Sequence, residues 1–300
     1  MQAQWPRSPY IGLWSRLHGF EKSKLDRALA RRQVTRSTLF RVTVHLVAAA
    51  NQPAFAALTH AQWREDFLRE GIPVDELIAR IERLAQDGPF TYAEANAVTP
   101  ELDRRPFLVR CLTPLVHVPP SGTWAQTRVR LTTADRWLGS PTAEAPAGTL
   151  IRSYLRAFGP ATRADLLRFS GLRVAAVDPA LETLEPKLRR FRDEHDRVLF
   201  DLQRGPLPPG ETEAPVRFLP RWDALLLSHD DRTRVLPREY QSTVIKGGDV
   251  LATFLVDGLV AGEWRYDGDK VAIEPFAPIP RKHRRPLDEE ARRLAAFLGR

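Results

Sequence analysis

The chain has 300 residues, 43% of them hydrophobic, with a formal net charge of +8 and an isoelectric point of about 10.0. This length gives room for two or three small domains, and the sequence has no run of 18 apolar residues that would predict a membrane span. The single cysteine, Cys111, excludes an intramolecular disulfide and cysteine-cluster zinc sites. With no visible signal peptide, we expect a cytoplasmic protein. The histidines lack metal-ligand spacing, so we expect no cofactor.

Arginine dominates the basic residues, because only six of the 45 are lysines. Its planar guanidinium binds phosphate through two parallel hydrogen bonds and stacks on bases. High-GC codon usage would produce the same bias without any functional reason. The charge therefore favours duplex DNA as the partner, with coding bias as the open alternative.

The first 72 residues read as an incomplete unit with a linker helix. Residues 10–17 and 24–30 are helical in pattern, and residues 34–39 and 41–48 alternate and are β-branched, which predicts a two-stranded wing. The helix that should precede this unit is missing, so we expect the reading frame to start upstream or the chain to be cut. Helices over residues 62–69 and 74–86 lead into the next unit.

A short peptide repeat marks two further units. Residues 88–94 (GPFTYAE) recur as residues 159–165 (GPATRAD). In each copy Gly-Pro ends a helix, and Thr91 or Thr162 can cap the next helix with an acid three residues on. A helix over 103–112 and strands at 115–118 and 127–132 complete the first copy. A weak helix that Pro179 and Pro186 interrupt or bound, then a hairpin over 188–202, complete the second.

The last third of the chain changes character. A stiff Pro-rich linker over 205–210 precedes β-rich runs at 216–219, 224–227, 251–256, 259–265 and 271–273, with hairpin turns at 257–258 and 267–268 and a final helix over 288–298. We therefore expect an α+β fold of tandem winged-helix domains, the first of them N-terminally truncated, with a small β-rich C-terminal module. The predicted boundaries are 1–72, 73–142, 143–204 and 205–300.

Four motifs occur in an order that resembles a known family. They are Gln2-Ala3-Gln4, residues 36–47 (RSTLFRVTVHLV), residues 218–232 (FLPRWDALLLSHDDR) and residues 256–265 (VDGLVAGEWR). Together they resemble the winged-helix DNA-binding proteins that include the AlkZ and YcaQ DNA glycosylases. The resemblance implies three winged helices and a β-rich part around a concave basic surface for duplex DNA. It also implies a Gln-apolar-Gln catalytic motif, which makes Gln2 and Gln4 the candidate catalytic residues.

The chemistry supports glutamine in that role. An N-alkylated purine is a cationic leaving group, so its excision needs little acid help and mainly requires a positioned water at C1′ of the sugar. A glutamine amide can hold that water as both donor and acceptor. On an extended segment, residues i and i+2 share one face, so both amides can grip one water. A position at the chain terminus counts against this, because terminal segments fray.

The remaining candidates each have a plainer alternative. Arg36, Arg41, His45, Arg232 and Arg234 are expected to contact DNA, although His45 is more typical of a strand residue that packs or bonds locally. Asp223 is a supporting residue or a structural cap of the β module. A basic run contributes phosphate contacts or is only a solvated tail; it comprises Arg281, Lys282, Arg284 and Arg285.

Two rival functions stay open at this point. A non-catalytic winged-helix regulator would have the same fold, since fold does not decide function, although it would usually bind a palindrome as a dimer through an uninterrupted recognition helix. The chain could also be an inactive, truncated paralogue. Our expectation is a monomeric, glycosylase-like factor that acts on alkylated bases or crosslinks in duplex DNA without a membrane partner.

Overall fold

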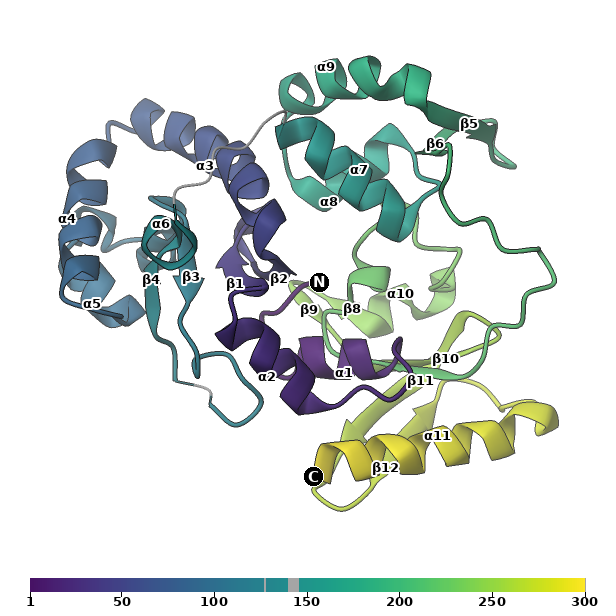
Figure 1. The fold of residues 1–300 in the computed structure, drawn as a ribbon. Coiled ribbons are helices and arrows are strands. Elements are labelled where there is room, and N and C mark those ends of the chain that lie inside the picture. Colours follow the sequence, from purple (N-terminus) through teal and green to yellow (C-terminus); the bar gives the residue numbers. More distant parts are fainter. Residues whose placement is uncertain (127, 140–145, 300) are drawn as a thin grey trace.

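A computed structural model describes residues 1–126, 128–139 and 146–299 (Figure 1). It combines helices with antiparallel sheets, which confirms a mixed α and β fold. The α-helices are α1 (Ser8–Trp14), α2 (Lys22–Ala30), α3 (Gln52–Arg69), α4 (Val74–Gln86), α5 (Tyr92–Ala97), α6 (Ala134–Leu138), α7 (Pro146–Phe158), α8 (Arg163–Ser170), α9 (Val174–Leu184), α10 (Arg238–Val244) and α11 (Arg281–Gly299). Short 3₁₀ segments are η1 (Phe40–Val42), η2 (Ala49–Asn51), η3 (Pro100–Leu102), η4 (Pro106–Cys111), η5 (Glu185–Lys187) and η6 (Ala224–Leu226).

The strands form four separate sheets. They are β1 (Val34–Thr38), β2 (Val44–Ala48), β3 (Leu115–His117), β4 (Leu131–Thr133), β5 (Leu188–Arg192), β6 (Val198–Leu202), β7 (Arg217–Leu219), β8 (Ile245–Lys246), β9 (Asp249–Val250), β10 (Thr253–Val256), β11 (Leu259–Tyr266) and β12 (Val271–Pro275). The sheet orders are β2-β1-β3-β4, β12-β11-β10-β7, β5-β6 and β8-β9. The first of these sheets joins strands that the sequence patterns assign to two different units.

The first sheet merges the strands of the first two predicted units. The β1–β2 and β3–β4 pairs both form as expected, but β1 also pairs with β3 through Ser37 and Val116. The Ser37 hydroxyl donates to the carbonyl of Leu115 at 2.9 Å. The expected wing strand over 127–132 is present as β4 from Leu131 onward, and its predicted first residue, Thr127, lies outside the described residues. The two predicted wings are therefore one four-stranded sheet.

The repeated capping boxes are confirmed in both copies. Thr91 accepts a hydrogen bond from the backbone of Glu94 at 3.2 Å, and Thr162 accepts one from Asp165 at 3.1 Å. Helix α4 ends just before the first box and α7 just before the second. In α4, residues 74, 77, 81 and 85 are buried at helical spacing, which is why this segment folds as an amphipathic helix.

Proline shapes the segment after each capping box. The expected α-helix over 103–112 is wrong: the segment contains only the 3₁₀ turn η4, because a proline at position 106 keeps Arg105 out of the helical region (φ −143°). In the other copy, α9 continues through Pro179, so an interruption there is wrong, but the helix ends at Leu184, just before Pro186, which confirms that this proline bounds it. The β5–β6 hairpin then forms over the predicted residues.

The C-terminal module matches its strand and turn predictions in most positions. Strands β7, β10, β11 and β12 form one sheet, and the two hairpin turns lie at residues 257–258 and 267–268. The expected strand over 224–227 is instead η6, which Asp223 caps by accepting from Leu225 N at 2.9 Å. Helix α11 begins at Arg281, not at the expected residue 288, and contains Pro286.

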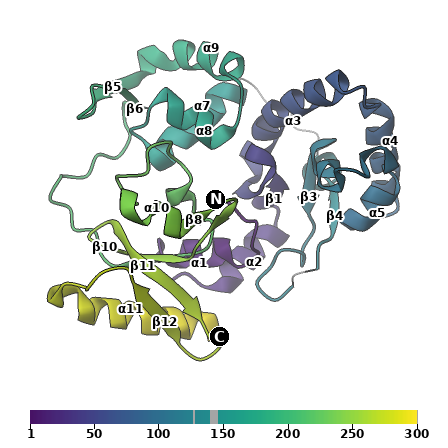
Figure 2. The ribbon, with the colours of Figure 1, turned by 180° about the vertical axis from the view of Figure 1, so that it is seen from behind.

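The N-terminus lies in the middle of the molecule. In Figures 1 and 2 it sits between the part that holds α3 to α6 with β3 and β4, the part that holds α7 to α9, and the C-terminal module. The buried cluster of the third unit includes residues from β1–β2 and α3, such as Phe40 and Phe55, packed with Leu150 and Tyr154 of α7. The segment that carries Gln2 and Gln4 is therefore central.

The two capping boxes predict different stability losses because their acids differ in burial. Asp165 is 5% exposed and also accepts from the backbone N–H of Asp230 at 2.8 Å, whereas Glu94 is exposed. Asp165→Ala leaves three partly buried donors unpaired, the N–H and hydroxyl of Thr162 and the N–H of Asp230, so we expect a loss of about 2–3 kcal/mol in the free energy of unfolding. Glu94→Ala should cost about 1 kcal/mol or less, like the loss of a single helix cap. Urea unfolding of both variants checks this, and equal losses would contradict it.

Candidate active site

The segment that carries both glutamines is held as an extra strand along β2. Ala3 N donates to the carbonyl of Val44 at 2.7 Å, and Leu46 N donates to the carbonyl of Met1 at 2.8 Å. Gln2 forms an antiparallel bridge with His45. The expectation of a frayed segment is wrong, because these bonds fix its backbone. Ala3 is fully buried in the core, so the alternation of an extended chain turns Gln2 and Gln4 away from that core.

The Gln2 side chain contacts Arg41, which links the N-terminal segment to helix α8. Arg41 sits at the β1–β2 turn with a left-handed backbone (φ 55°), an uncommon conformation for a residue other than glycine. Its guanidinium donates to the carbonyl of Phe169 at the end of α8 and to Gln2 Oε1 at 3.4 Å. Burial, and then the nearby Arg168 and Arg232, lower the pKa of Arg41 to about 10. The surroundings of Gln2 are therefore strongly cationic.

Gln4 is the more accessible of the two glutamines. Gln2 is 8% exposed, whereas Gln4 is exposed. The Gln4 Oε1 atom accepts from the backbone N–H of Val44 at 3.1 Å, which fixes the amide plane. An amide oxygen has a second lone pair and its nitrogen has two donors. Gln4 can therefore hold a water molecule without losing its bond to β2.

Arg36 and His45 are buried and do not form an open surface. Arg36 is 3% exposed and donates from Nη2 to the carbonyl of Ala3 at 2.5 Å, so its positive charge lies behind the glutamine segment. His45 is 2% exposed and its Nδ1 lies 2.9 Å from the carbonyl of Thr43. Neither side chain presents an open surface for a DNA contact in this structure, and the local bond expected of His45 is present.

Comparisons with known proteins identify the family of the chain. A family model described as "DNA glycosylase AlkZ-like" matches residues 1–297. The chain belongs to the AlkZ-like DNA glycosylase family. An interstrand DNA cross-link repair glycosylase of Streptomyces sahachiroi is 27% identical over 177 residues, which cover 54% of this chain and 46% of that protein. The match to this curated relative thus spans about half of its length.

A solved structure extends the likeness to the fold. Streptomyces sahachiroi DNA glycosylase AlkZ superimposes with a TM-score of 0.80 at 20% sequence identity, over 99% of this chain and 88% of that one. The two proteins therefore share their fold over 99% of this chain. In this AlkZ-like chain, the glutamine segment lies at the centre of that architecture (Figure 1).

Of two further predicted arginines, Arg232 lies near Arg41 on the Gln2 side of the site. Arg232 influences the pKa of Arg41 and is partly buried, and Arg234 is exposed and donates to the carbonyl of Pro160 at 3.4 Å. Sequence reasoning missed Arg168, which stands on α8 near both Arg41 and Arg232. Its only signal was its position near the end of the helix that follows the second capping box.

Asp223 has a structural role in the described chain. Its carboxylate forms a two-point ion pair with Arg16, at 2.6 and 3.0 Å, and caps η6. The side chain is 1% exposed. The structural-cap alternative is therefore confirmed, and both oxygens of Asp223 already have partners. A supporting role would act through Arg16 and α1.

The C-terminal basic run (residues 281–285) lies far from Gln2 and Gln4. It occupies the first turns of α11, at the end of this helix away from the chain terminus, in a part of Figures 1 and 2 that is distant from the N mark. Arg281 and Arg284 are exposed, Lys282 pairs with Asp257 at 3.5 Å and Arg285 with Glu289 at 2.8 Å. Any contact of this run with DNA would therefore be peripheral.

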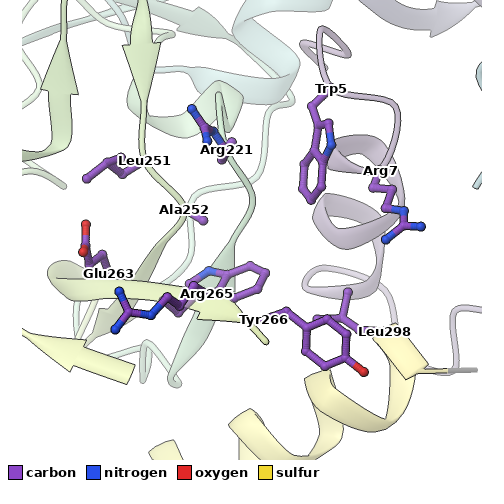
Figure 3. A pocket seen from close by; sticks show the side chains of 10 residues that line it. Trp5, Arg7, Arg221, Leu251, Ala252, Glu263, Arg265, Tyr266 and Leu298 are labelled. Atoms are coloured by element: carbon purple, nitrogen blue, oxygen red, sulfur yellow. The ribbon is translucent and has the colours of Figure 1, made fainter. Parts of the chain in front are cut away.

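The residue after Gln4 ties the segment to the C-terminal module. Trp5 packs against the buried core of that module and lines a pocket of about 380 Å³. Figure 3 shows the Trp5 side chain pointing from the N-terminal segment into this pocket, with Arg221 to one side and Tyr266 and Leu298 below it. The glutamine segment is thus held by β2 on one side and by the C-terminal module on the other.

Two buried histidines predict a loss of stability in mild acid. Burial lowers the pKa of His45 and of His60 to about 3, from an ordinary value of 6.5. Below pH 6.5 the unfolded chain therefore binds more protons, so their contribution is complete above pH 6.5 and is lost as the pH falls toward 3. We expect a loss of up to about 1.4 kcal/mol per pH unit for each histidine.

Urea unfolding at several pH values between 7 and 5 checks this. His60→Gln should reduce the pH slope of the free energy of unfolding, whereas a change at the exposed His195 should leave the slope intact. An unchanged slope in His60→Gln would contradict the buried neutral imidazole.

Proposed function

We propose that this protein is a monofunctional DNA glycosylase that excises alkylated bases or crosslinks from duplex DNA. The observation that carries the proposal is the central Gln2-Ala3-Gln4 segment, fixed along β2 and surrounded by arginines. Family membership over residues 1–297 supports it and favours it over a non-catalytic regulator or an inactive paralogue. The crosslink part follows the described role of the Streptomyces sahachiroi relative.

The proposed reaction is hydrolysis of one N-glycosidic bond. Gln4 accepts a hydrogen bond from a water whose oxygen attacks C1′, while the bond to the cationic base breaks and its electron pair stays on the base. The water's second proton passes to solvent, which leaves an abasic sugar. Orientation of the water contributes most of the catalysis, because glutamine is too weak a base to remove a proton early.

We propose a winged-helix interpretation for the repeated units. Each capped helix is followed by further helical segments and a strand pair, which are the parts of a winged helix. The domain boundaries 1–72, 73–142, 143–204 and 205–300 belong to this proposal, and the boundary at 142–143 lies outside the described residues. Arg41, Arg232 and Arg234 would face the duplex, with the run at the start of α11 as a peripheral contact, and we expect a monomer.

An excision assay tests the proposed activity. The protein is incubated in excess with a duplex that carries one N7-methylguanine, free base is measured by chromatography, and abasic sites are measured by alkaline strand cleavage. We expect equal amounts of free base and abasic sites. Tight binding without release of N7-methylguanine, N3-methyladenine or a crosslinked base would favour the non-catalytic alternative.

A further inference from the structure

A small pocket beside Gln4 contains two arginines. Its volume is about 130 Å³, and Gln4, Arg36, Arg110, His117 and Tyr92 are among the residues that line it. It lies at the junction of the glutamine segment, β1, β3 and η4. None of the pocket's basic residues other than Arg36 was expected from the sequence.

Arg36 lies in the wall of this pocket, and its positive charge has no acidic partner among the described residues. In the part of the chain that the structure describes, no carboxylate lies within ion-pair distance of Arg36, and its Nε and Nη1 atoms are buried without a hydrogen-bond partner. Gly122 allows this placement, because a Cβ at that position would clash with Arg36 Nη1. A buried cation without a partner is costly, so this pocket favours an anion.

Arg110 and His117 add to the same imbalance. The Arg110 guanidinium lies 4.6 Å from the Tyr92 ring centre, its Nε is buried without a partner, and no described carboxylate pairs with it. His117 Nε2 is also buried without a partner, while its Nδ1 lies 3.1 Å from the Ser121 hydroxyl. Burial, and then Arg36 and Arg110, hold the pKa of His117 well below its ordinary value. Arg36, Arg110 and His117 can each donate a hydrogen bond. None of them carries a negative charge that would neutralise the two guanidinium groups.

We propose that this pocket binds one phosphate group, with Arg110 making the direct contact and Arg36 supplying a second positive charge from behind the wall. The inference rests on the proposed function, and the phosphate it assigns is a DNA phosphodiester beside the damaged nucleotide. The pocket has room for one such group, and guanidinium groups suit phosphate geometry. A phosphate held beside Gln4 places negative charge near the sugar, where it stabilises the positive charge that develops at C1′.

The variant that tests this is Arg110→Ala. Arg36 also holds the Ala3 carbonyl, so its removal would disturb the glutamine segment itself. Arg110 is half-buried and holds no backbone group in the described structure, which makes a folded variant attainable. Arg104→Ala is the matched control, because it removes the same charge from an exposed position on the adjoining segment.

The assay is a scan of duplexes that each carry one neutral methylphosphonate near a lesion, with affinity measured by fluorescence anisotropy. We expect one position where the replacement weakens binding of the wild-type protein and of Arg104→Ala by about tenfold, the scale of one charge-assisted hydrogen bond. At that position Arg110→Ala should show no further loss. Additive losses at every position would overturn the assignment to DNA.

A second measurement separates the sources of phosphate. Inorganic phosphate is titrated into each protein without DNA and followed by NMR of the arginine side chains. Inorganic phosphate could bind in a way that depends on Arg110 while no methylphosphonate position abolishes the effect of Arg110→Ala on DNA affinity. That result would show a site for free phosphate and overturn the DNA assignment. No coupling and no phosphate binding would overturn the phosphate site altogether. Both readouts are independent of base excision, so failure of the glycosylase proposal would be seen separately.

Discussion

Replacing Gln4 with alanine is expected to slow single-turnover base excision by roughly 10²-fold, the scale for losing one group that positions or stabilises the reacting atoms. The structure holds the Gln4 amide on the backbone N–H of Val44 and leaves the side chain exposed, so the alanine variant removes the water-binding group together with that one hydrogen bond. DNA affinity should stay similar. The rate is measured with protein in excess over a duplex that carries N7-methylguanine.

A matched glutamine elsewhere controls for general effects. Gln203 is exposed and bonds only to the carbonyl of Pro186 within the described chain, at 3.1 Å. Gln203→Ala should keep the wild-type rate. If Gln4→Ala and Gln203→Ala excised base equally fast, Gln4 would have no catalytic role.

Salt is expected to weaken binding to duplex DNA by about 500-fold between 50 and 200 mM, if about five phosphates are neutralised. The net charge of +8 and the cluster of Arg41, Arg168 and Arg232 near Gln2 are the physical basis. Each neutralised phosphate releases condensed counterions, which makes the affinity fall with a constant slope on a double-logarithmic plot. Anisotropy of a labelled undamaged duplex measures this slope.

Variants that each remove one arginine show which side chains contribute to the salt slope. Arg232→Ala should reduce the slope by about one, because it removes one phosphate contact. The matched variant Arg69→Ala, which removes an exposed arginine of α3 paired with Glu65 and Asp66, should leave the slope unchanged. A flat salt response of the wild-type protein would contradict DNA binding through phosphates.

Local sequence signals predicted the parts of the fold that depend on neighbouring residues. Both capping boxes form because a threonine and an acid three residues on satisfy each other within one helical turn. The hairpin turns of the C-terminal module likewise depend on residues 257–258 and 267–268 alone. The Gln2-Ala3-Gln4 segment, by contrast, became the candidate site through the resemblance to a known family, because three such residues alone carry little information.

Contacts between residues far apart in the chain could not be predicted from the sequence patterns. The Ser37–Val116 contact that joins two predicted wings into one sheet links positions far apart in the chain, and no periodicity records it. For Asp223 the sequence leaves a supporting role and a structural cap open, and only the structure shows its pairing with Arg16, just after α1. Arg110 gives no signal at all, because its relation to Gln4 arises only when η4 packs beside the N-terminal segment.

Single-turnover release of N7-methylguanine by the wild-type protein and by the Gln2→Ala/Gln4→Ala double variant is the most direct measurement of the glycosylase mechanism. Both proteins should bind the duplex with similar affinity, and urea unfolding checks that the double variant remains folded after the loss of the buried Gln2 side chain. The glutamine mechanism predicts release by the wild-type protein and a fall of at least about 10²-fold in the double variant. Equal rates of release by the two proteins would contradict it.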